Sequence, residues 1–377
     1  PEGYTLTSTE RNGTVTTLTN TYTPETVEVP GKKTWVDNDD EYDLRPTSIT
    51  IRLYADGVEI DVKKVTAADG WSWTFTDLPK YKDGVEIVYT VAEDLIPGYT
   101  TLQDGYNFTN TITTVKVSKV DITNEEEVPG ALLQIFDKNG NKIEQWISTE
   151  TPHEIYGLKV GETYTLREKT APEGYTVVTA DTTFVVNSDG SVTATGSKVE
   201  DGVILVADAP TKVSVSKVDI TDQKELPGAH IQIIDNEGNV VTEWDSTETP
   251  HEITGLKTNV TYTLHETIAP DGYTIAADTT FVIDEKGNVT SSGTVTEDGV
   301  VLVEDWPTKI YVSKVDITNQ KEVAGAHIQI IDAKGKVVEE WDSNGTPHEI
   351  TGLNTNETYT LHETIAPDGF TIADDTT

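Results

Sequence analysis

The 377-residue chain is strongly acidic, with 65 Asp and Glu against 27 Lys and Arg and a formal net charge of −38 at pH 7. This charge argues against nucleic acid and anionic membrane surfaces as partners, because both are themselves negative. The chain has no cysteine for a disulfide, and no apolar run approaches the roughly 18 residues of a membrane-spanning helix, so no direct membrane contact is expected.

Residues 1–29 are expected to be the C-terminal part of a preceding domain. They begin with PEGYT and end near LTNTYTP, and both phrases match the last part of a complete unit. The chain is therefore interpreted as a window on a longer array of domains.

Residues 30–114 form the first complete domain that the sequence predicts. Apolar and polar residues alternate over 48–54, 71–75 and 86–91, which is typical of strands with one buried face. Asp-Gly pairs between such runs, as at 56–57, supply the positive φ that a tight turn needs.

Three further domains repeat one sequence and are predicted at 115–211, 212–308 and 309–377. The phrase SKVD recurs at 118, 216 and 313, and each unit is long enough to own a hydrophobic core. The last copy ends at ADDTT, so its closing strand is expected beyond residue 377. No segment has helical periodicity. The predicted fold class is all-β, with tandem antiparallel β-sandwich domains arranged end to end as a rod with short, stiff linkers.

Each repeat places a lysine in its first strand and a glutamate at a constant spacing after it. An aspartate in the closing strand completes the first two sets. The sets are Lys119, Glu168 and Asp208; Lys217, Glu266 and Asp305; and Lys314 with Glu363. A strand lysine is most often a surface residue with its amine in water, but an acidic residue inside an apolar closing strand favours a buried trio.

Such a trio has the groups needed to form an amide inside the protein. A nucleophilic amine must be neutral, and burial lowers the pKa of a lysine from its usual value of about 10.4. The same burial keeps a carboxyl protonated, so that the glutamate can polarise the acceptor carbonyl and transfer protons. The reaction happens once per molecule, so a turnover enzyme is not expected, and neither a cofactor nor a metal is predicted.

The repeats resemble the Cna B-type domains of Gram-positive surface proteins. The resemblance is carried by SKVDITDQKELPGAHIQIID, HETIAPDGYTIAADTTFVIDEKGNV and VLVEDWPTK, and in the first domain by KTW, RPTSITIRLYADG, YTVAE and FTNT. It implies an immunoglobulin-like or prealbumin-like β-sandwich with a spontaneous Lys–Asn or Lys–Asp isopeptide bond beside a catalytic glutamate. Carried onto the first domain, the motif implies Lys33, Glu93 and Asn110. Lys32 adjoins Lys33, but the spacing to Trp35 favours Lys33.

Several other motifs are interpreted as structural. The acidic segment 37–41 lacks the glycine and distal glutamate of a calcium loop, so a solvated acidic turn is expected there. The seven histidines show no zinc spacing, and His265 and His362 should point away from the adjacent glutamates. Lys80 is expected in a turn. The three tryptophans that recur in phase are expected to pack on the core: Trp146, Trp244 and Trp341.

These features favour the stalk of a Gram-positive adhesin or pilus-like appendage at the cell surface, outside the cell. The alternative is a binding module that recognises a host or matrix component, and the distinct domain 30–114 is the best candidate for it. Neighbouring subunits of a surface fibre are the other expected partners.

Overall fold

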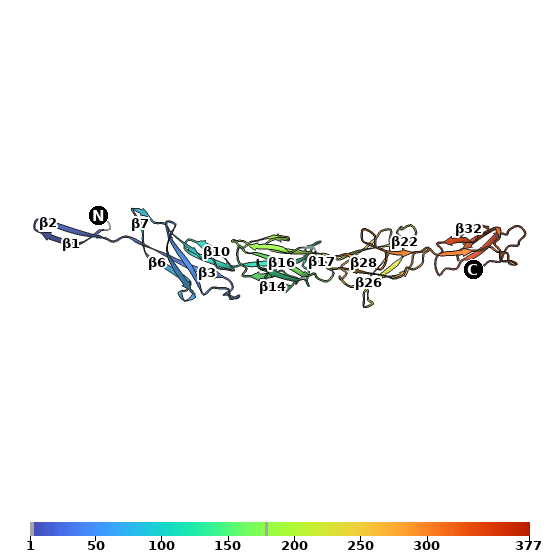
Figure 1. The fold of residues 1–377 in the computed structure, drawn as a ribbon, viewed down its shortest axis with the longest axis horizontal. Helices are drawn as coiled ribbons and strands as arrows, with labels where there is room; N and C mark the ends of the chain where they lie inside the picture. The colour runs from blue at the N-terminus through green and yellow to red at the C-terminus, as the bar shows by residue number, and fades with distance from the viewer. Residues whose placement is uncertain (1–3, 178–179) are drawn as a thin grey trace. The chain divides into compact units, whose positions relative to one another are not determined.

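The computed structural model describes residues 4–177 and 180–377, and its regular structure is almost entirely β-strand (Figure 1). The chain forms two compact units, residues 1–172 with 178–208 and residues 173–177 with 209–377. The described residues contain a single helical element, the 3-10 turn η1 (Ala67–Asp69), and no helix that could cross a membrane. The predicted all-β class with tandem β-sandwiches is confirmed.

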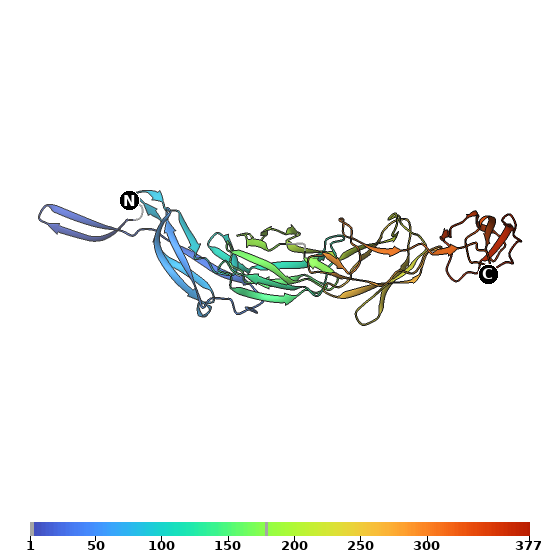
Figure 2. The same ribbon diagram turned by 45° about the vertical axis from the view of Figure 1, so that its right-hand side comes forward.

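The first unit begins with a two-stranded hairpin. Strands β1 (Tyr4–Asn12) and β2 (Val15–Tyr22) lie side by side in both views (Figures 1 and 2), and every residue of both strands is exposed. Neither strand pairs with any other strand of the described residues.

The first sandwich follows the hairpin and has two main sheets, ordered β10-β11-β3-β6 and β5-β4-β9, while β7 and β8 pair in a separate two-stranded sheet. Its core forms because alternate residues such as Ile49, Ile51 and Leu53 turn inward. Strand β11 runs parallel to β3, so the first and last strands of the sandwich are neighbours. The strands are β3 (Thr26–Val36), β4 (Ser48–Ala55), β5 (Val58–Thr66), β6 (Ser72–Pro79), β7 (Tyr81–Lys82), β8 (Val85–Glu86), β9 (Tyr89–Glu93), β10 (Tyr99–Asp104) and β11 (Asn107–Ile112).

The first repeat has the same plan. Its opening strand β12 lies between β15, which is antiparallel to it, and the closing strand β21, which is parallel; the facing sheet is ordered β14-β13-β16-β18-β19. The strands are β12 (Thr114–Asp121), β13 (Leu132–Phe136), β14 (Lys142–Ile147), β15 (His153–Tyr156), β16 (Thr163–Thr170), β17 (Tyr175–Val177), β18 (Thr182–Val186), β19 (Val192–Thr195), β20 (Lys198–Glu200) and β21 (Val203–Pro210).

In the second unit, the next repeat reproduces this arrangement, with β22 between β25 and the parallel β29, and a facing sheet ordered β24-β23-β26-β27-β28. The strands are β22 (Lys212–Asp219), β23 (His230–Ile234), β24 (Val240–Asp245), β25 (His251–Thr254), β26 (Thr261–Ile268), β27 (Thr279–Ile283), β28 (Val289–Ser291) and β29 (Val300–Asp305).

The last repeat has a smaller core. Strand β30 pairs with β33, and no described strand lies on its other edge; the facing sheet is ordered β32-β31-β34. The strands are β30 (Lys309–Val312), β31 (Ala324–Ile331), β32 (Val337–Asn344), β33 (His348–Thr351) and β34 (Thr360–Ile365). Lys314 therefore lies beyond the end of β30, although SKVD predicts a strand there.

A threonine before each repeat joins two glycine turns by hydrogen bonds. Thr113 donates its N–H to Gly98 O (3.0 Å) and its hydroxyl to Leu158 O (2.6 Å), and it accepts the N–H of Gly157 (3.0 Å). The second unit contains two more such clamps, Thr211 with Gly174, Leu256 and Gly255, and Thr308 with Gly272, Leu353 and Gly352. Each threonine thus joins its linker to one turn that precedes the linker in the chain and one that follows it.

Glycine is required in these clamps for two reasons. Gly272 has φ +84°, and a Cβ there would lie 2.9 Å from Gly352 O. Gly299 has φ +81° but no atom within 4 Å of a Cβ, so it serves as a matched control. Positive φ costs a non-glycine residue about 1–2 kcal/mol at either position, and only Gly272→Ala adds a collision with backbone.

We therefore expect Gly272→Ala to accelerate amide hydrogen exchange at Thr308 and Gly352, and Gly299→Ala to leave both rates near those of the unsubstituted chain. Site-resolved hydrogen exchange by NMR measures this difference. Equal exchange in the two variants would show that the close approach contributes nothing to the clamp.

Candidate functional site

The predicted site of the first sandwich lies between its two sheets. Lys33 is on β3 and Asn110 on the neighbouring β11, while Glu93 is on β9 of the facing sheet. On β11, Phe108 lies opposite Lys33, and Asn110 follows Phe108 by two positions. The side chains of Lys33 and Asn110 therefore project from the same face of the sheet. Lys33 and Asn110 are buried, whereas Lys32 is exposed, which leaves Lys33 as the only one of the two lysines that reaches the core.

The charges of this site are only weakly solvated. The Nζ atom of Lys33 contacts both carboxylate oxygens of Glu93, at 2.6 Å for Oε2. Burial lowers the pKa of Lys33 to about 8, although Glu93 opposes the shift, and burial raises the pKa of Glu93. Both shifts favour the neutral pair. The Asn110 amide adjoins Glu93, yet neither of its polar atoms has a hydrogen bond of ordinary geometry within the described chain.

The first repeat assembles the same kind of site with an aspartate as the acceptor. Lys119 on β12 lies 2.7 Å from Asp208 Oδ1 on β21 and 3.5 Å from Glu168 Oε2 on β16 of the facing sheet. None of the three side chains is more than 1% exposed. Burial, with a smaller contribution from the Asp208 charge, raises the pKa of Glu168 to about 8, while Lys119 acts in the opposite direction.

In the second repeat Lys217 contacts Asp305 on β29 and lies 2.8 Å from Glu266 Oε1 on β26. Burial raises the pKa of Asp305 to about 7 against the opposing effect of Lys217. The backbone N–H of Ala276 donates to Glu266 Oε2 (2.6 Å) and holds this carboxyl in place. The residue at the corresponding position of the first repeat, Val178, lies outside the described residues.

Each complete repeat therefore buries one amine with two carboxyls. Fully ionised, the three groups would leave one uncompensated negative charge in a dry core, which is strongly unfavourable. Retaining a proton on one carboxyl removes that charge. A neutral carboxyl beside an amine at hydrogen-bonding distance is the arrangement that amide formation requires.

The last repeat brings together only two of these groups. Lys314 lies 2.9 Å from Glu363, and the N–H of Ala373 donates to Glu363 Oε2 (2.6 Å). The Lys314 side chain is 15% exposed, whereas those of Lys119 and Lys217 are fully buried. Within the described residues, no Asp or Asn forms an ion pair or hydrogen bond with Lys314.

The structure adds a tyrosine–aspartate contact that the sequence analysis did not identify, buried in the first sandwich and partly buried in the second repeat. Tyr99 donates its hydroxyl to Asp37 (2.9 Å), and Tyr273 donates to Asp219 (2.8 Å), two residues after Lys217. A signal existed only in the repeats, where Pro-x-Gly-Tyr recurs together with the aspartate of SKVD. The Ala276 amide could not be found this way, because every residue except proline has such a donor.

The acidic segment 37–41 is only partly the solvated turn that was predicted. Asp37 is buried, accepts a hydrogen bond from Arg45 Nε (2.7 Å) and has a pKa lowered chiefly by that guanidinium, so the prediction is wrong for this residue. Asp39 is fully exposed, as predicted. Nowhere in 4–177 or 180–377 do three His, Cys, Asp or Glu residues form a group suited to a metal ion.

The other interpreted residues have structural contacts. His265 pairs with Asp278, and His362 pairs with Asp375. Both contacts lie on the exposed side of the strand, away from the buried glutamates. Lys80 follows β6 and pairs with Glu25 (3.0 Å). The predicted core packing of the three tryptophans is confirmed, and each also stacks on a histidine: Trp146 on His153, Trp244 on His251 and Trp341 on His348.

Two domain families match the chain. The Cna protein B-type domain matches residues 29–111, and the prealbumin-like fold domain matches residues 113–199, 211–297 and 308–377. The collagen adhesin of Staphylococcus aureus is 28% identical over 388 residues, which cover 94% of this chain and 31% of that protein. The chain thus spans less than a third of this relative.

Similar solved structures include the pilus adhesin SpaC of Lactobacillus rhamnosus GG in its open conformation, with 17% identity, a TM-score of 0.41, and coverage of 80% of this chain and 46% of that one. Two B repeat units of the Staphylococcus aureus collagen-binding protein are 23% identical, with a TM-score of 0.24 and coverage of 92% and 95%.

The lowered pKa of Lys33 predicts a pH dependence in Asn110→Ala, which has no acceptor side chain beside this amine. Lys33 has a pKa of about 8 in the folded domain and the ordinary 10.5 in the unfolded chain. Between these values the unfolded chain binds a proton that the folded chain has lost, so the free energy of unfolding rises with pH from about 8 to about 10.5.

Denaturant unfolding of the Cna protein B-type domain in Asn110→Ala, followed across this pH range, measures the slope. The matched control is Asn110→Ala combined with Lys33→Met, which removes the titrating amine and should flatten the curve. The assignment is wrong if both proteins show the same slope.

Proposed function

The chain belongs to the prealbumin-like fold domain family, with a Cna protein B-type domain at its N-terminal side, and we propose that it is a structural stalk of a Gram-positive adhesin or pilus-like appendage. In this proposal residues 30–114, 115–211 and 212–308 each close with an autocatalytic isopeptide bond. The bonds join Lys33 to Asn110, Lys119 to Asp208, and Lys217 to Asp305. The stalk stands outside the cell, at the cell surface.

The observation that carries the proposal is the burial of each lysine between its acceptor and a glutamate from the facing sheet. A buried ion pair alone is weak evidence for stabilisation, because removing the charges from water offsets much of their attraction. A bond that converts the amine and acceptor into a neutral amide removes this cost. Three such trios in three consecutive domains support a shared chemistry.

The reaction needs only the residues of each trio. The neutral amine of Lys119 attacks Cγ of Asp208, and Glu168 holds a proton near the acceptor oxygen, which becomes more negative as the bond forms. A new C–N bond replaces a C–O bond, and the departing oxygen leaves as water with one proton from the amine and one from a carboxyl group of the trio. At Asn110 the bond that breaks is Cγ–Nδ2, and ammonia leaves. No oxidation state changes.

The position of these bonds suits a protein under tension. The first and last strands are parallel neighbours in all three domains, so the chain enters and leaves each domain at opposite ends of one strand pair. An amide between these strands transmits force across the pair without opening the rest of the sandwich. Closing loops of this length also stabilises by about 4–5 kcal/mol in the chain-entropy account.

A binding role is the second candidate, and the similarity to a protein named collagen adhesin favours it. In this alternative the domain at residues 30–114 recognises a host matrix protein, and the repeats act as spacers. Retention of the whole chain on immobilised collagen, abolished by substitutions on the surface of residues 30–114 alone, would establish this role. Passage of the chain without retention supports the stalk.

We expect the intact mass of the 377-residue chain to be lower than its sequence mass by one ammonia and two waters. Each of Glu93→Gln, Glu168→Gln and Glu266→Gln should restore one of these losses, because the amide cannot supply the proton that the acceptor needs. High-resolution mass spectrometry under denaturing conditions measures the masses of the unsubstituted chain and of the three variants.

Glu200→Gln is the matched control, since Glu200 forms an ion pair with Lys198 (2.8 Å) at the surface. This substitution should leave the loss of one ammonia and two waters unchanged. A full-length mass equal to the sequence mass would refute the isopeptide bonds, and full losses in the three glutamine variants would refute the role of the glutamates.

A further inference from the structure

The closing strand of the second repeat presents a carboxylate and an indole side by side on its outer face. Val303 and Asp305 of β29 point inward and are buried, so the residues that alternate with them, Leu302, Glu304 and Trp306, share the opposite face. Trp306 is 60% exposed, although tryptophan ordinarily removes most of its surface from water. An exposed ring beside a carboxylate is a feature that packing of the sandwich does not require.

This face is one wall of an open pocket of about 570 Å³ in the second unit. The other walls are the segment after β26, at residues 274–277 and 279, and the turn after β28, at residues 292–294. Gly293 adds no side chain to its wall, where a Cβ would lie 2.9 Å from Thr279 Cγ2. The volume falls within the range of about 300–1,000 Å³ that small-molecule sites occupy.

The carboxylate of the pocket is oriented by two neighbouring side chains. Glu304 accepts a hydrogen bond from the hydroxyl of Thr294 (2.8 Å) at one oxygen and from the side-chain amide of Gln223 (3.1 Å) at the other. A carboxylate has about four acceptor positions, so Glu304 retains acceptor capacity for a ligand. Thr279 and Ser292 bring hydroxyl groups to the same pocket.

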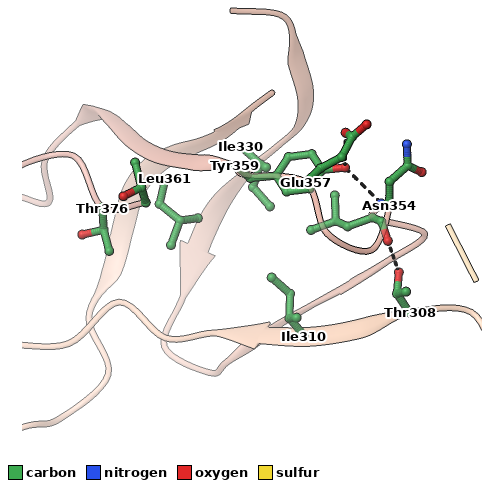
Figure 3. A pocket seen from close by; sticks show the side chains of 10 residues that line it. Thr308, Ile310, Ile330, Asn354, Glu357, Tyr359, Leu361 and Thr376 are labelled. Atoms are coloured by element: carbon green, nitrogen blue, oxygen red, sulfur yellow. Dashed lines mark hydrogen bonds between the residues drawn. The ribbon is translucent and has the colours of Figure 1, made fainter. Parts of the chain in front are cut away.

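The backbone that carries Trp306 is fixed at the residue itself and beyond it. Trp306 O accepts both the N–H of Thr274 (3.0 Å) and its hydroxyl (3.2 Å). Two residues later Thr308 donates its hydroxyl to Leu353 O (2.5 Å), as Figure 3 shows. A ring on a fixed backbone loses little conformational freedom when a ligand binds to it, which favours its use as a binding surface.

The first repeat lacks both of these side chains. Its closing strand reads LVADAP where the second repeat reads LVEDWP, so Ala207 and Ala209 stand at the positions of Glu304 and Trp306. The buried aspartate between them is the same in both repeats. The two sequences thus differ on the outer face of the strand, where the core and the buried trio are unaffected.

The chemistry of the pocket fits a neutral saccharide. The face of an indole is electron-rich and attracts the partly positive C–H groups on one face of a pyranose ring. Sugar hydroxyls can donate to the Glu304 carboxylate, and the threonine and serine hydroxyls both donate and accept. A proline-rich segment also stacks on such a ring, but proline has no N–H to replace the water that the carboxylate would lose.

Charge narrows the class of ligand further. The described residues that line the pocket include Glu304 but no Lys, Arg or His, and the chain has a net charge of −38, so an anionic sugar would be repelled. A quaternary ammonium group is usually held in a cage of several aromatic rings. Trp306 is the only aromatic residue among the described residues of this pocket.

We propose that the second repeat binds a neutral pyranose-containing glycan in this pocket, with a sugar ring stacked on Trp306 and sugar hydroxyls donating to Glu304. This inference goes beyond the stalk role and is independent of the isopeptide bonds, because Lys217, Glu266 and Asp305 do not line the pocket. It places glycan recognition in the second repeat, separate from any binding role of residues 30–114.

NMR of the seven tryptophan indole N–H groups tests the site in the whole chain. The signal of Trp306 is the one that is missing from Trp306→Ala. Neutral disaccharides built of glucose, galactose, mannose or N-acetylglucosamine serve as probes at about 20 mM, which nearly saturates a site with a dissociation constant on the order of 1 mM. At least one of them should shift the Trp306 signal, whereas glucuronate, choline and a proline-rich peptide should leave it in place.

Saturation-transfer NMR, observed on the protons of the sugar that binds, compares the variants. Trp306→Ala should abolish the transfer, and Glu304→Gln should weaken binding about tenfold, because a neutral amide is a poorer acceptor than a carboxylate. Tyr311→Ala is the matched control, since Tyr311 is 61% exposed but does not line the pocket, and it should bind as the unsubstituted chain does. Trp306→Ala should keep the fold, because the side chain is exposed and the first repeat has alanine at this position.

Three results would each overturn the proposal. The first is the absence of a Trp306 shift with every neutral disaccharide. The second is a shift with choline or the proline-rich peptide but with none of the sugars, which would assign the pocket to another class of ligand. The third is transfer to the sugar that persists in Trp306→Ala. The intact mass of the same samples reports the isopeptide bonds separately, so failure of glycan binding is distinguished from failure of the proposed function.

Discussion

The structure depends on lysine amines that are buried with carboxyl groups between two β-sheets. An ammonium group in an apolar core is too costly to persist unpaired, and pairing it with two carboxyls leaves excess negative charge. The sandwich accommodates this arrangement because its first and last strands lie side by side and place lysine and acceptor on one inward face. The glutamate comes from the facing sheet, so the trio forms only when both sheets have packed.

This dependence places the reactive groups under the control of the fold. In the unfolded chain the amine of Lys33 has its ordinary pKa of 10.5 and is almost wholly protonated at neutral pH. In the folded sandwich burial lowers that pKa to about 8 and raises those of Glu93 and Glu168. Folding therefore brings the groups together and shifts their pKa values toward the neutral forms that the proposed amide-forming reaction needs.

The sequence predicted the all-β class and, in the repeats, the residues that meet in each trio, because recurrent spacing in repeats of one length requires equivalent positions on equivalent strands. The trio of the first sandwich followed from the family resemblance. It could not predict that Asp37 is buried, since a run of acidic residues is ordinarily solvated and only the packed structure brings Tyr99 and Arg45 to it. The amides of Ala276 and Ala373 were also missed, because a backbone donor leaves no mark on residue type.

The last repeat shows which part of the trio depends on the closing strand. Lys314 and Glu363 keep their mutual distance of 2.9 Å, so this contact needs only the opening segment and the facing sheet. Without a parallel neighbour among the described strands, however, β30 ends at Val312, and the Lys314 side chain is partly exposed. The equivalent Lys217 lies within β22 and is fully buried. The closing strand thus contributes more than an acceptor: its hydrogen bonds extend the opening strand across the lysine, and its apolar side chains exclude water from the amine.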